Sequence, residues 1–295
     1  MIRAAIVIVL FEPKTDNWKL SVDTILKCGY FPIIIDNSEI SPAIGDTTGF
    51  MYVRHNENRG IAWAQNKGIK KALEMKVDII GFFDQDSMIS VELLSKLMLA
   101  LERDNVSLVA PVSYDENSGE EYPSHRISKS GKLQEIFCQS QSNLVPVDIA
   151  ISSGTFARRE VFDKVGFFNE GLFIDFVDIE WCLKCKKNGV QLYIIPEAKM
   201  YHSIGEIKKQ IGPFVVEVHS PYRTYYKIRN ALLLLKDGMG VKFSFFQIVP
   251  AVVLNFFLMF DTNKGKEYRI YYMQGLLDGI RGLNGKYESI HKILR

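Results

Sequence analysis

Residues 77–87 read VDIIGFFDQDS, and this stretch decides the fold class. Its apolar first part predicts a buried β-strand, and the polar residues after it mark the end of that strand. Earlier in the chain, the runs RAAIVIV at residues 3–9 and GYFPIIIDNS at residues 29–38 predict two further buried strands. Segments with helical periodicity lie between the strands, at residues 18–29 and 61–75. This alternation predicts an α/β fold with a mostly parallel, Rossmann-like sheet covered by helices.

The alternation of strand and helix patterns continues further along the chain. Residues 91–103 have helical periodicity, SLVAPV at residues 107–112 predicts a strand, and the polar residues 115–132 are expected to form a surface loop. The pattern becomes helical near residue 213. We therefore expect an α/β domain over residues 1–212 and a C-terminal helical extension over residues 213–295.

The composition excludes some classes of protein. Apolar residues make up 47% of the chain and charged residues 24%, which indicates a folded globular protein. The 36 basic and 34 acidic side chains give a net charge of +2, which is too low for a protein that binds along the nucleic-acid backbone. We therefore expect no nucleic-acid partner. The four cysteines form no disulfide pattern and no secretory signal opens the chain, so a reducing cytoplasm is expected.

The charges are unevenly distributed along the chain. Residues 1–200 hold 22 basic and 27 acidic side chains, whereas residues 201–295 hold 14 basic and 7 acidic ones. An acidic first part suits a site that uses carboxylates and a divalent metal, and a basic, apolar tail suits an anionic surface such as a membrane leaflet. A chance fluctuation is the alternative explanation.

Residues 243–260 contain no formal charge, but they include Ser244, Gln247, Pro250 and Asn255. A membrane-spanning helix needs about 20 consecutive apolar residues. Three interpretations therefore stand: helices that lie in the membrane interface, helices that are buried in the protein, and a true span.

Asp84 and Asp86 form the sharpest local feature, directly after the strand IIGFF. Side chains two residues apart in an extended backbone project to the same side, so both carboxylates leave the strand end together. Such a pair could hold Mg²⁺ or Mn²⁺ together with the phosphates of a nucleotide. The alternative is an acidic turn that caps the helix starting near Ser90.

Polar residues also follow the earlier strands. Asp36 ends the strand IIID, where a carboxylate could bind a base or ribose, and a simple turn is the alternative. Asn58, Gly60 and Asn66 belong to NRGIAWAQNKG, in which a loop glycine precedes a helix. That arrangement permits close approach of a ligand, and an ordinary helix start explains it equally well.

A second carboxylate cluster, Asp175, Asp178 and Glu180, lies in FIDFVDIEWCLK. One of these carboxylates could act as a general base. The alternative is the acidic first turn of a helix. His202, after the strand YIIPEAKM, could complete a metal site or simply be polar surface.

The ordered set IIIDNS, NRGIAWAQNKG, FFDQDS, ISSGTFARREVFDKVGFFNE, FVDIEWCLK and MYHS resembles the inverting glycosyltransferases of family 2, which have the GT-A fold. The resemblance covers roughly residues 1–205. The tail SPYRTYYKIRNALLLLK is similar to that of the dTDP-rhamnosyltransferases of bacterial polysaccharide assembly. The resemblance to the family implies a GT-A catalytic domain over residues 1–212, with a nucleotide-binding half up to about residue 105 and an acceptor half from about residue 106.

The resemblance implies a metal-dependent inverting transfer of L-rhamnose from dTDP-L-rhamnose to a hydroxyl of a lipid-linked saccharide in cell-surface polysaccharide synthesis. The cofactor would be Mg²⁺ or Mn²⁺. The protein would be cytoplasmic and peripheral on the inner face of the plasma membrane. Two alternatives are a UDP-sugar transferase and a noncatalytic partner in a glycan-assembly complex. A nucleotidyltransferase is disfavoured because no glycine precedes Gly29.

The resemblance also implies a role for each candidate residue. Asp178 would be the catalytic base, although Val177 stands where the family has Glu, and this leaves Glu180 and Asp175 as candidates for the base or for acceptor binding. The expected nucleotide-binding residues are Asp36, Asn58, Gly60, Asn66, Asp84 and Arg229. The expected metal ligands are Asp86 and His202. The expected contacts of donor sugar and acceptor are Ser153, Gly154, Trp181 and Arg223. Packing of the helix is the alternative for both arginines.

Overall fold

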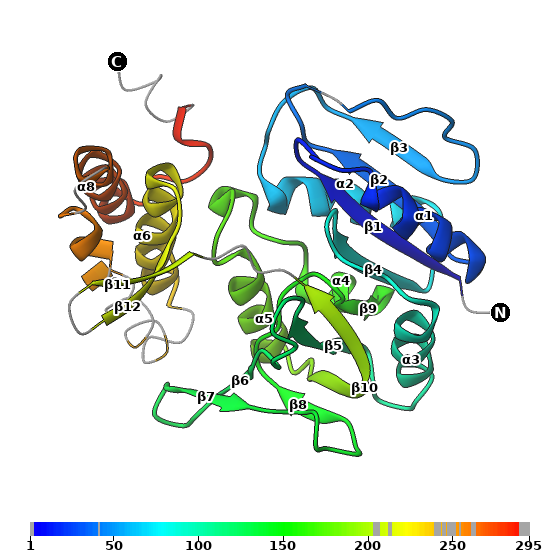
Figure 1. Ribbon diagram of the computed structural model, residues 1–295. Coiled ribbons are helices and arrows are strands. Elements are labelled where there is room, and N and C mark those ends of the chain that lie inside the picture. The colour runs from blue at the N-terminus through cyan, green and yellow to red at the C-terminus, as the bar shows by residue number, and fades with distance from the viewer. Residues whose placement is uncertain are drawn as a thin grey trace.

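The computed structural model describes residues 3–40, 42–202, 207–211, 214–238, 243, 246, 252–253, 255–260 and 264–288, and for residues 202–211 and 214–218 it describes the backbone alone. One eight-stranded sheet forms its centre, in the order β3-β2-β1-β4-β9-β5-β10-β8 (Figure 1). Because this sheet continues across residue 105, the two halves expected within the catalytic domain share one sheet.

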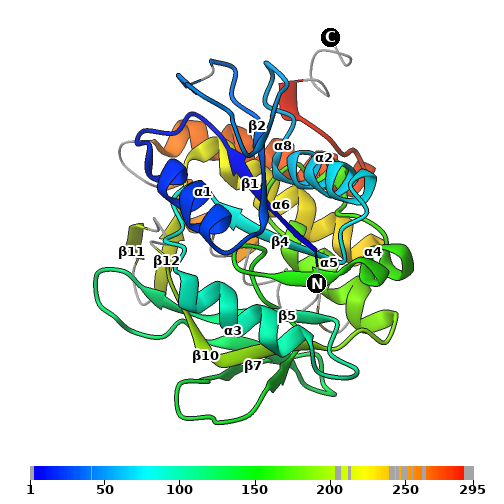
Figure 2. The same cartoon turned by 90° about the vertical axis from the view of Figure 1, so that its right-hand side faces the viewer.

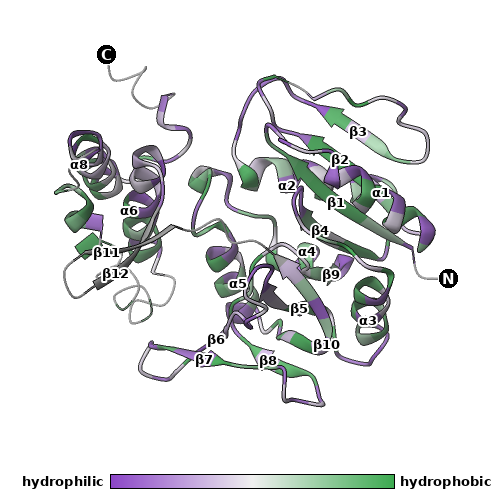
Figure 3. Cartoon of the chain, viewed as in Figure 1, coloured by the Kyte–Doolittle hydropathy of each residue, from purple (hydrophilic) through white to green (hydrophobic). Residues whose placement is uncertain are grey.

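The first four strands of the sheet are parallel. They are β1 (Ala4–Leu10), β2 (Phe31–Asp36), β3 (Met51–Arg54) and β4 (Ile79–Asp84). All seven residues of β1 are buried, as expected for a strand with helices on both faces. Figure 3 shows the apolar character of β1 and β4. The carboxyl ends of β2 and β4 carry Asp36 and Asp84 to the same edge of the sheet.

The second half of the sheet mixes directions. The antiparallel strand β9 (Phe156–Arg158) lies between β4 and β5 (Leu108–Asp115). Strand β10 (Leu192–His202) is parallel to β5, and β8 (Val145–Val147) forms the antiparallel edge. The mostly parallel sheet is confirmed.

Two short hairpins stand outside the central sheet: β6 (Ser124–Ile127) with β7 (Leu133–Ile136), and β11 (Ile207–Ile211) with β12 (Phe214–Val218). Strand β6 falls within the polar stretch that we expected to be a loop. The expectation was wrong there because backbone groups of the stretch find protein partners. The amide of Ile127, for example, donates to the Asp148 carboxylate at 2.6 Å.

Two layers of helices cover the sheet (Figure 2). Helices α1 (Asn17–Lys27) and α3 (Val91–Leu101) pack on one face through side chains such as Trp18, Ile25 and Leu94. Helices α2 (Ile61–Glu74), α4 (Arg159–Val165) and α5 (Val177–Lys187) cover the other face through side chains such as Ala64, Val161 and Trp181. Covering both faces confirms the α/β class.

The C-terminal part is helical, as expected. Helix α6 (Pro221–Lys236) starts at Ser220, whose hydroxyl accepts a hydrogen bond from the amide of Arg223, and α8 (Gly265–Arg281) packs against it. No helix within the described residues is long and apolar enough to cross a membrane. Eight of the 18 residues of the uncharged stretch 243–260 lie outside the described residues. Of the others, Phe243 is buried in the main core and Phe260 is exposed.

Candidate active site

The end of β4 is hydrogen-bonded to the turn that precedes β9. The amide of Asp84 donates to the hydroxyl oxygen of Ser153 at 3.1 Å, and this hydroxyl also lies 2.7 Å from that of Ser87. Gly154 has a φ of +80°, and an added Cβ would lie 2.6 Å from the Pro111 ring. A larger residue therefore cannot replace Gly154 without moving the turn. The expected residues Ser153 and Gly154 thus lie beside Asp84.

Three carboxylates gather at this strand end and affect one another's charge. Burial, and then the charge of Asp86, raise the pKa of Asp84 to about 7. Burial, and then the charge of Asp84, raise the pKa of Asp178 to about 6. In the described part of the chain no lysine or arginine is paired with any of the three. Residues from β4 and α5 therefore form one cluster of negative charge, which we call the carboxylate cluster: Asp84, Asp86 and Asp178.

Ser152 affects the charge of Asp178. Its backbone and side chain act to lower the pKa of Asp178, which favours the charged form against the effect of burial. The hydroxyl of Ser152 in turn accepts a hydrogen bond of 2.7 Å from the Gln65 side chain. Gln65 and Ser152 are residues that the sequence analysis missed. The motif NRGIAWAQNKG contains Gln65, but helix periodicity alone does not tell which of Gln65 and Asn66 faces the cluster.

Asp175 has a different environment from Asp178. Its carboxylate accepts hydrogen bonds from Nε and Nη2 of Arg223, at 2.9 to 3.1 Å. Such a bidentate contact fixes both partners in one geometry. The structure therefore joins these two candidates to each other, and Asp175 connects the loop before α5 to α6.

The loop before α5 has an unusual backbone that α6 supports. Phe173, Asp175 and Phe176 all have positive φ values between 62° and 66°, a region that costs free energy for residues other than glycine. The Asn230 side chain donates to the carbonyl oxygens of Leu172, Ile174 and Asp175 at 2.7 to 2.9 Å. We call residues 172–176 the left-handed segment.

Arg229 lies behind the left-handed segment and is fully buried. Its guanidinium donates to the carbonyl oxygens of Gly171, Leu172 and Gly285 and stacks against the rings of Tyr225 and Tyr226. These contacts use the guanidinium within the protein, so they support the packing alternative for Arg229.

The left-handed segment also meets the start of α2. The carbonyl oxygen of Phe173 accepts a hydrogen bond of 2.9 Å from the amide of Ile61. At Gly60 an added Cβ would lie 2.4 Å from that carbonyl oxygen. Gly60 is therefore needed for this close approach, and Asn58 shapes the same turn by accepting a hydrogen bond from the Gly60 amide at 3.0 Å.

Asp36 is fully buried at the end of β2. One carboxylate oxygen accepts a hydrogen bond of 2.5 Å from the hydroxyl of Tyr52, and the other accepts one of 3.0 Å from the Ser38 amide. These contacts support the turn alternative, in which Asp36 shapes the loop beside the carboxylate cluster.

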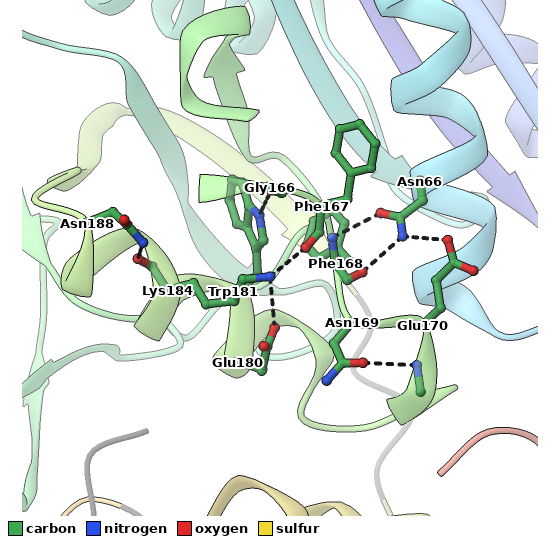
Figure 4. A network of polar contacts seen from close by, with 11 residues as sticks. Asn66, Gly166, Phe167, Phe168, Asn169, Glu170, Glu180, Trp181, Lys184 and Asn188 are labelled. Carbon is green, nitrogen blue, oxygen red and sulfur yellow. Dashed lines mark hydrogen bonds and ion pairs between the residues drawn. The ribbon is translucent and has the colours of Figure 1, made fainter. Parts of the chain in front are cut away.

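Asn66 and Trp181 also have partners inside the protein (Figure 4). Asn66 donates to the Phe168 carbonyl oxygen and the Glu170 carboxylate, both at 2.9 Å, and accepts a hydrogen bond from the Phe168 amide. Trp181 is 2% exposed and donates to the Gly166 carbonyl oxygen at 3.0 Å. Both side chains therefore stabilise the segment between α4 and α5.

Glu180 points away from solvent and is 6% exposed. Burial raises its pKa to about 7, although Lys184 acts in the opposite direction from 3.9 Å. Figure 4 shows Glu180 beside Lys184, which also donates to the Phe167 carbonyl oxygen. The charge of Asp84 acts on Asp178, whereas the charges that act on Glu180 are those of Lys184 and Asp237. Asp178 therefore has the better position for a base.

The donor set of the cluster fits a divalent cation. Asp84 and Asp86 offer hard oxygen ligands, and a cation would reduce the repulsion between their two negative charges. Within the described residues, no group of three or more His, Cys, Asp or Glu side chains is placed so that it could hold a metal ion by itself. The backbone of His202 ends β10, and its side chain lies outside the described residues. Substrate phosphates commonly complete the coordination of Mg²⁺ at such sites.

Comparison with known proteins shows the family. The family model described as Glycosyl transferase family 2 matches residues 33–166. A protein of Shigella flexneri named dTDP-rhamnosyl transferase RfbF is 35% identical over 284 residues, which cover 95% of this chain and 96% of that protein. The chain belongs to glycosyl transferase family 2. It is therefore a glycosyltransferase, as the order of its motifs indicated.

A more distant relative and two solved structures are also similar to this chain. The hexosyltransferase Agl10 of low-salt glycan biosynthesis in Haloferax volcanii is 22% identical over 88% of this chain and 85% of its own length. The crystal structure of GalNAc-T7 with UDP, GalNAc and Mn²⁺ matches with a TM-score of 0.61 and 13% identity, over 95% of this chain and 56% of that chain. S. aureus TarS 1–349 matches with a TM-score of 0.53 and 12% identity, over 96% and 83%. These likenesses support the expected GT-A fold.

Proposed function

We propose that this glycosyltransferase moves L-rhamnose from dTDP-L-rhamnose, with inversion, to a hydroxyl of a lipid-linked saccharide acceptor. The observation that carries the reaction class is the placement of Asp178 beside Asp84 in one carboxylate cluster. The donor identity is supported by the 35% identity to a protein named dTDP-rhamnosyl transferase. The lipid-linked acceptor rests on the sequence resemblance.

Asp178 is the proposed base. It accepts the proton of the acceptor hydroxyl while that oxygen bonds to the anomeric carbon of the donor sugar, and the bond from this carbon to the diphosphate breaks with its electron pair on the diphosphate. Attack from the face opposite the leaving group inverts the anomeric centre. The backbone and side chain of Ser152 favour the charged form of this carboxylate. With a pKa raised to about 6, Asp178 is a stronger base than an ordinary Asp and is still ionised near neutral pH.

Asp86, with Asp84 beside it and His202 as a further candidate, would hold Mg²⁺ or Mn²⁺, which supplies positive charge to the departing diphosphate. Ser153 and Gly154 are proposed to line the place of the donor sugar because they are fixed next to Asp84. The loop after β2 and the Asn58–Gly60 turn are proposed to border the nucleoside, with Asp36 acting through the loop that it shapes. Arg223 is proposed to act through its contact with Asp175.

A panel of nucleotide sugars tests the donor. Thermal unfolding of the protein is measured with dTDP-L-rhamnose, UDP-glucose and UDP-N-acetylgalactosamine, each with Mg²⁺, with Mn²⁺ and with a chelator. We expect dTDP-L-rhamnose with metal to raise the unfolding midpoint most. Greater protection by a UDP-sugar would replace the proposed donor and keep the reaction class. No protection by any donor, together with no hydrolysis, would favour the noncatalytic alternative.

A further inference from the structure

Helix α8 packs against α6 through two glycines and Asp278, and it also buries the rings of Tyr268 and Tyr272. An added Cβ at Gly275 would lie 2.6 Å from the Tyr225 carbonyl oxygen, and one at Gly279 would lie 2.7 Å from the Leu232 side chain. The buried Asp278 carboxylate accepts a hydrogen bond of 2.8 Å from the Tyr225 hydroxyl. The two glycines allow this close approach of the helices.

The outer side of α8 is apolar. Ile270, Met273, Leu277 and Ile280 are 47%, 48%, 45% and 58% exposed, respectively. Their spacing of three, four and three residues places them in one stripe along the helix. We call these four residues the outer stripe. An ordinary surface helix has polar residues on the side away from the core, whereas α8 has a second apolar stripe there. Figure 1 shows α8 on the side of α6 that faces away from the sheet.

Two exposed phenylalanines lie near another side of the same helix. Phe256 and Phe260 are exposed, their rings lie 5.5 Å apart, and the Phe256 ring lies 6.1 Å from the Tyr272 ring on α8. A large exposed apolar surface on a folded protein commonly marks a place of interaction. A partner that offers apolar contact is therefore expected here.

Positive charge surrounds the outer stripe. Lys266, Arg269 and Arg281 are exposed on α8, and Glu267 is the exposed acidic residue of this helix. At 100° per residue, Lys266 and Arg281 lie at the two ends of the stripe and Arg269 lies at its edge. The wider segment 201–295 has the same bias, with 14 basic and 7 acidic side chains. The partner therefore combines an apolar interior with negative charge at its surface.

We propose that the outer stripe of α8 docks onto a bilayer surface that contains anionic lipids, with the helix lying in the plane of the interface. Its four apolar side chains enter the boundary between headgroups and acyl chains, and Lys266, Arg269 and Arg281 contact the anionic headgroups. A second copy of the chain fits this surface less well. Two α8 helices paired about a twofold axis would bring Lys266 of one copy toward Arg281 of the other. The proposal does not depend on the donor or the acceptor.

Vesicle flotation with the full chain tests the proposal. Vesicles of phosphatidylcholine alone are compared with vesicles that also contain phosphatidylglycerol. We expect the protein to float with the anionic vesicles and high salt to weaken this binding. Leu277→Glu should weaken the binding roughly tenfold or more, because it places a charge in the middle of the outer stripe. Replacing Lys266 and Arg269 by Gln should remove the preference for anionic vesicles.

Leu99→Glu is the matched control, because Leu99 is a 56% exposed leucine on α3. It should float like the unchanged protein, and all variants should unfold at similar temperatures. Equal flotation of Leu277→Glu and Leu99→Glu would overturn the proposal, as would no flotation of the unchanged protein. A dimer in sedimentation velocity that Leu277→Glu converts to monomer would show that a second copy covers the stripe. Donor protection in the same samples reports on the proposed function separately.

Discussion

Asp175 and Asp178 lie three residues apart, but their surroundings differ in kind. Asp175 is held by a bidentate contact with Arg223, and its carbonyl oxygen is held by Asn230. Asp178 belongs to a cluster whose other members are also acidic, and its pKa is raised. A carboxylate with a cationic partner serves the fold, whereas carboxylates gathered without one indicate a site for a ligand or a proton. The acidic pattern of the sequence is the same in both cases, and only the partners separate them.

The strongest test of this difference is Asp178→Asn. It should lower kcat about a thousandfold, because the amide cannot accept the proton of the acceptor hydroxyl. Binding of dTDP-L-rhamnose, measured by calorimetry, should stay within a few-fold of the unchanged protein. Asp175→Asn is the matched change three residues away and should retain more activity. If Asp178→Asn keeps most of the activity, the base is Asp175 or Glu180.

Asp86→Ala should come next in size. Losing this ligand should lower kcat about a hundredfold and remove the dependence of nucleotide binding on Mg²⁺ or Mn²⁺. Titration of dTDP with metal and with chelator measures this dependence directly. Metal-dependent binding that persists unchanged in Asp86→Ala would assign the metal to other residues.

The support given by α6 can be broken at Asn230. Asn230→Asp keeps the shape of the side chain but replaces the donor to three carbonyl oxygens by an acceptor. We expect kcat to fall about tenfold and amide hydrogen exchange over residues 172–178 to become faster. Tyr268→Phe removes one buried hydrogen bond of 2.6 Å elsewhere in the C-terminal region and should change neither. Equal effects of the two variants would mean that α6 contributes general stability alone.

Arg223→Ala should mainly affect stability. It leaves the Asp175 carboxylate, which is 7% exposed, without its cation, and this should cost about 2 kcal/mol of unfolding free energy. Urea denaturation measures the change. The double variant with Asp175→Asn should recover part of the loss, and a double variant as unstable as the sum of the single ones would show that the two residues do not act as a pair.

The pH dependence of stability should reflect the raised carboxyl pKa values. Asp84, Asp178 and Glu180 have pKa values of about 7, 6 and 7 in the folded protein, against ordinary values of 3.8, 3.8 and 4.5. Between these values the folded state binds more protons than the unfolded state, so stability falls as the pH rises from about 4 to about 7. The metal-free protein should therefore unfold at a lower temperature near neutral pH than near about pH 5.

This effect is expected to be the smallest of the five, and two variants separate its sources. Asp84→Asn should flatten the pH dependence, whereas Asp175→Asn should leave it in place. Metal together with dTDP should reverse the trend, because a cation favours the charged carboxylates. A pH dependence that Asp84→Asn leaves unchanged would show that Asp84 is not one of its sources.

Periodicity was sufficient to predict the strands and helices that carry the site. The runs around Asp36 and Asp84 are apolar and bounded by polar residues, so their ends could be located from the chain alone. It could not predict β9, because a three-residue strand has no periodic signal, and it missed β6 in a polar stretch whose backbone is paired. Short elements are determined by tertiary contacts.

The same limit applies to the candidate residues. Residue type and position at a strand end brought Asp84, Asp86 and Asp178 to attention, and the structure joins them by their charges. Asn66 and Arg229 have equally suggestive side chains, yet their hydrogen bonds go to backbone carbonyls of the fold. Gln65 and Ser152 became visible only through their contacts with each other and with Asp178. Sequence identifies which groups can do chemistry, and packing decides which of them are available.

The antiparallel strand β9 has a consequence for motion. It hydrogen-bonds to β4 on one side and to β5 on the other, so it joins the first half of the sheet to the second. A hinge between the two halves would have to break this ladder, which makes opening and closing of two rigid lobes unfavourable. Any ordering around a bound donor is therefore left to the turns at the sheet edge and to the C-terminal helices.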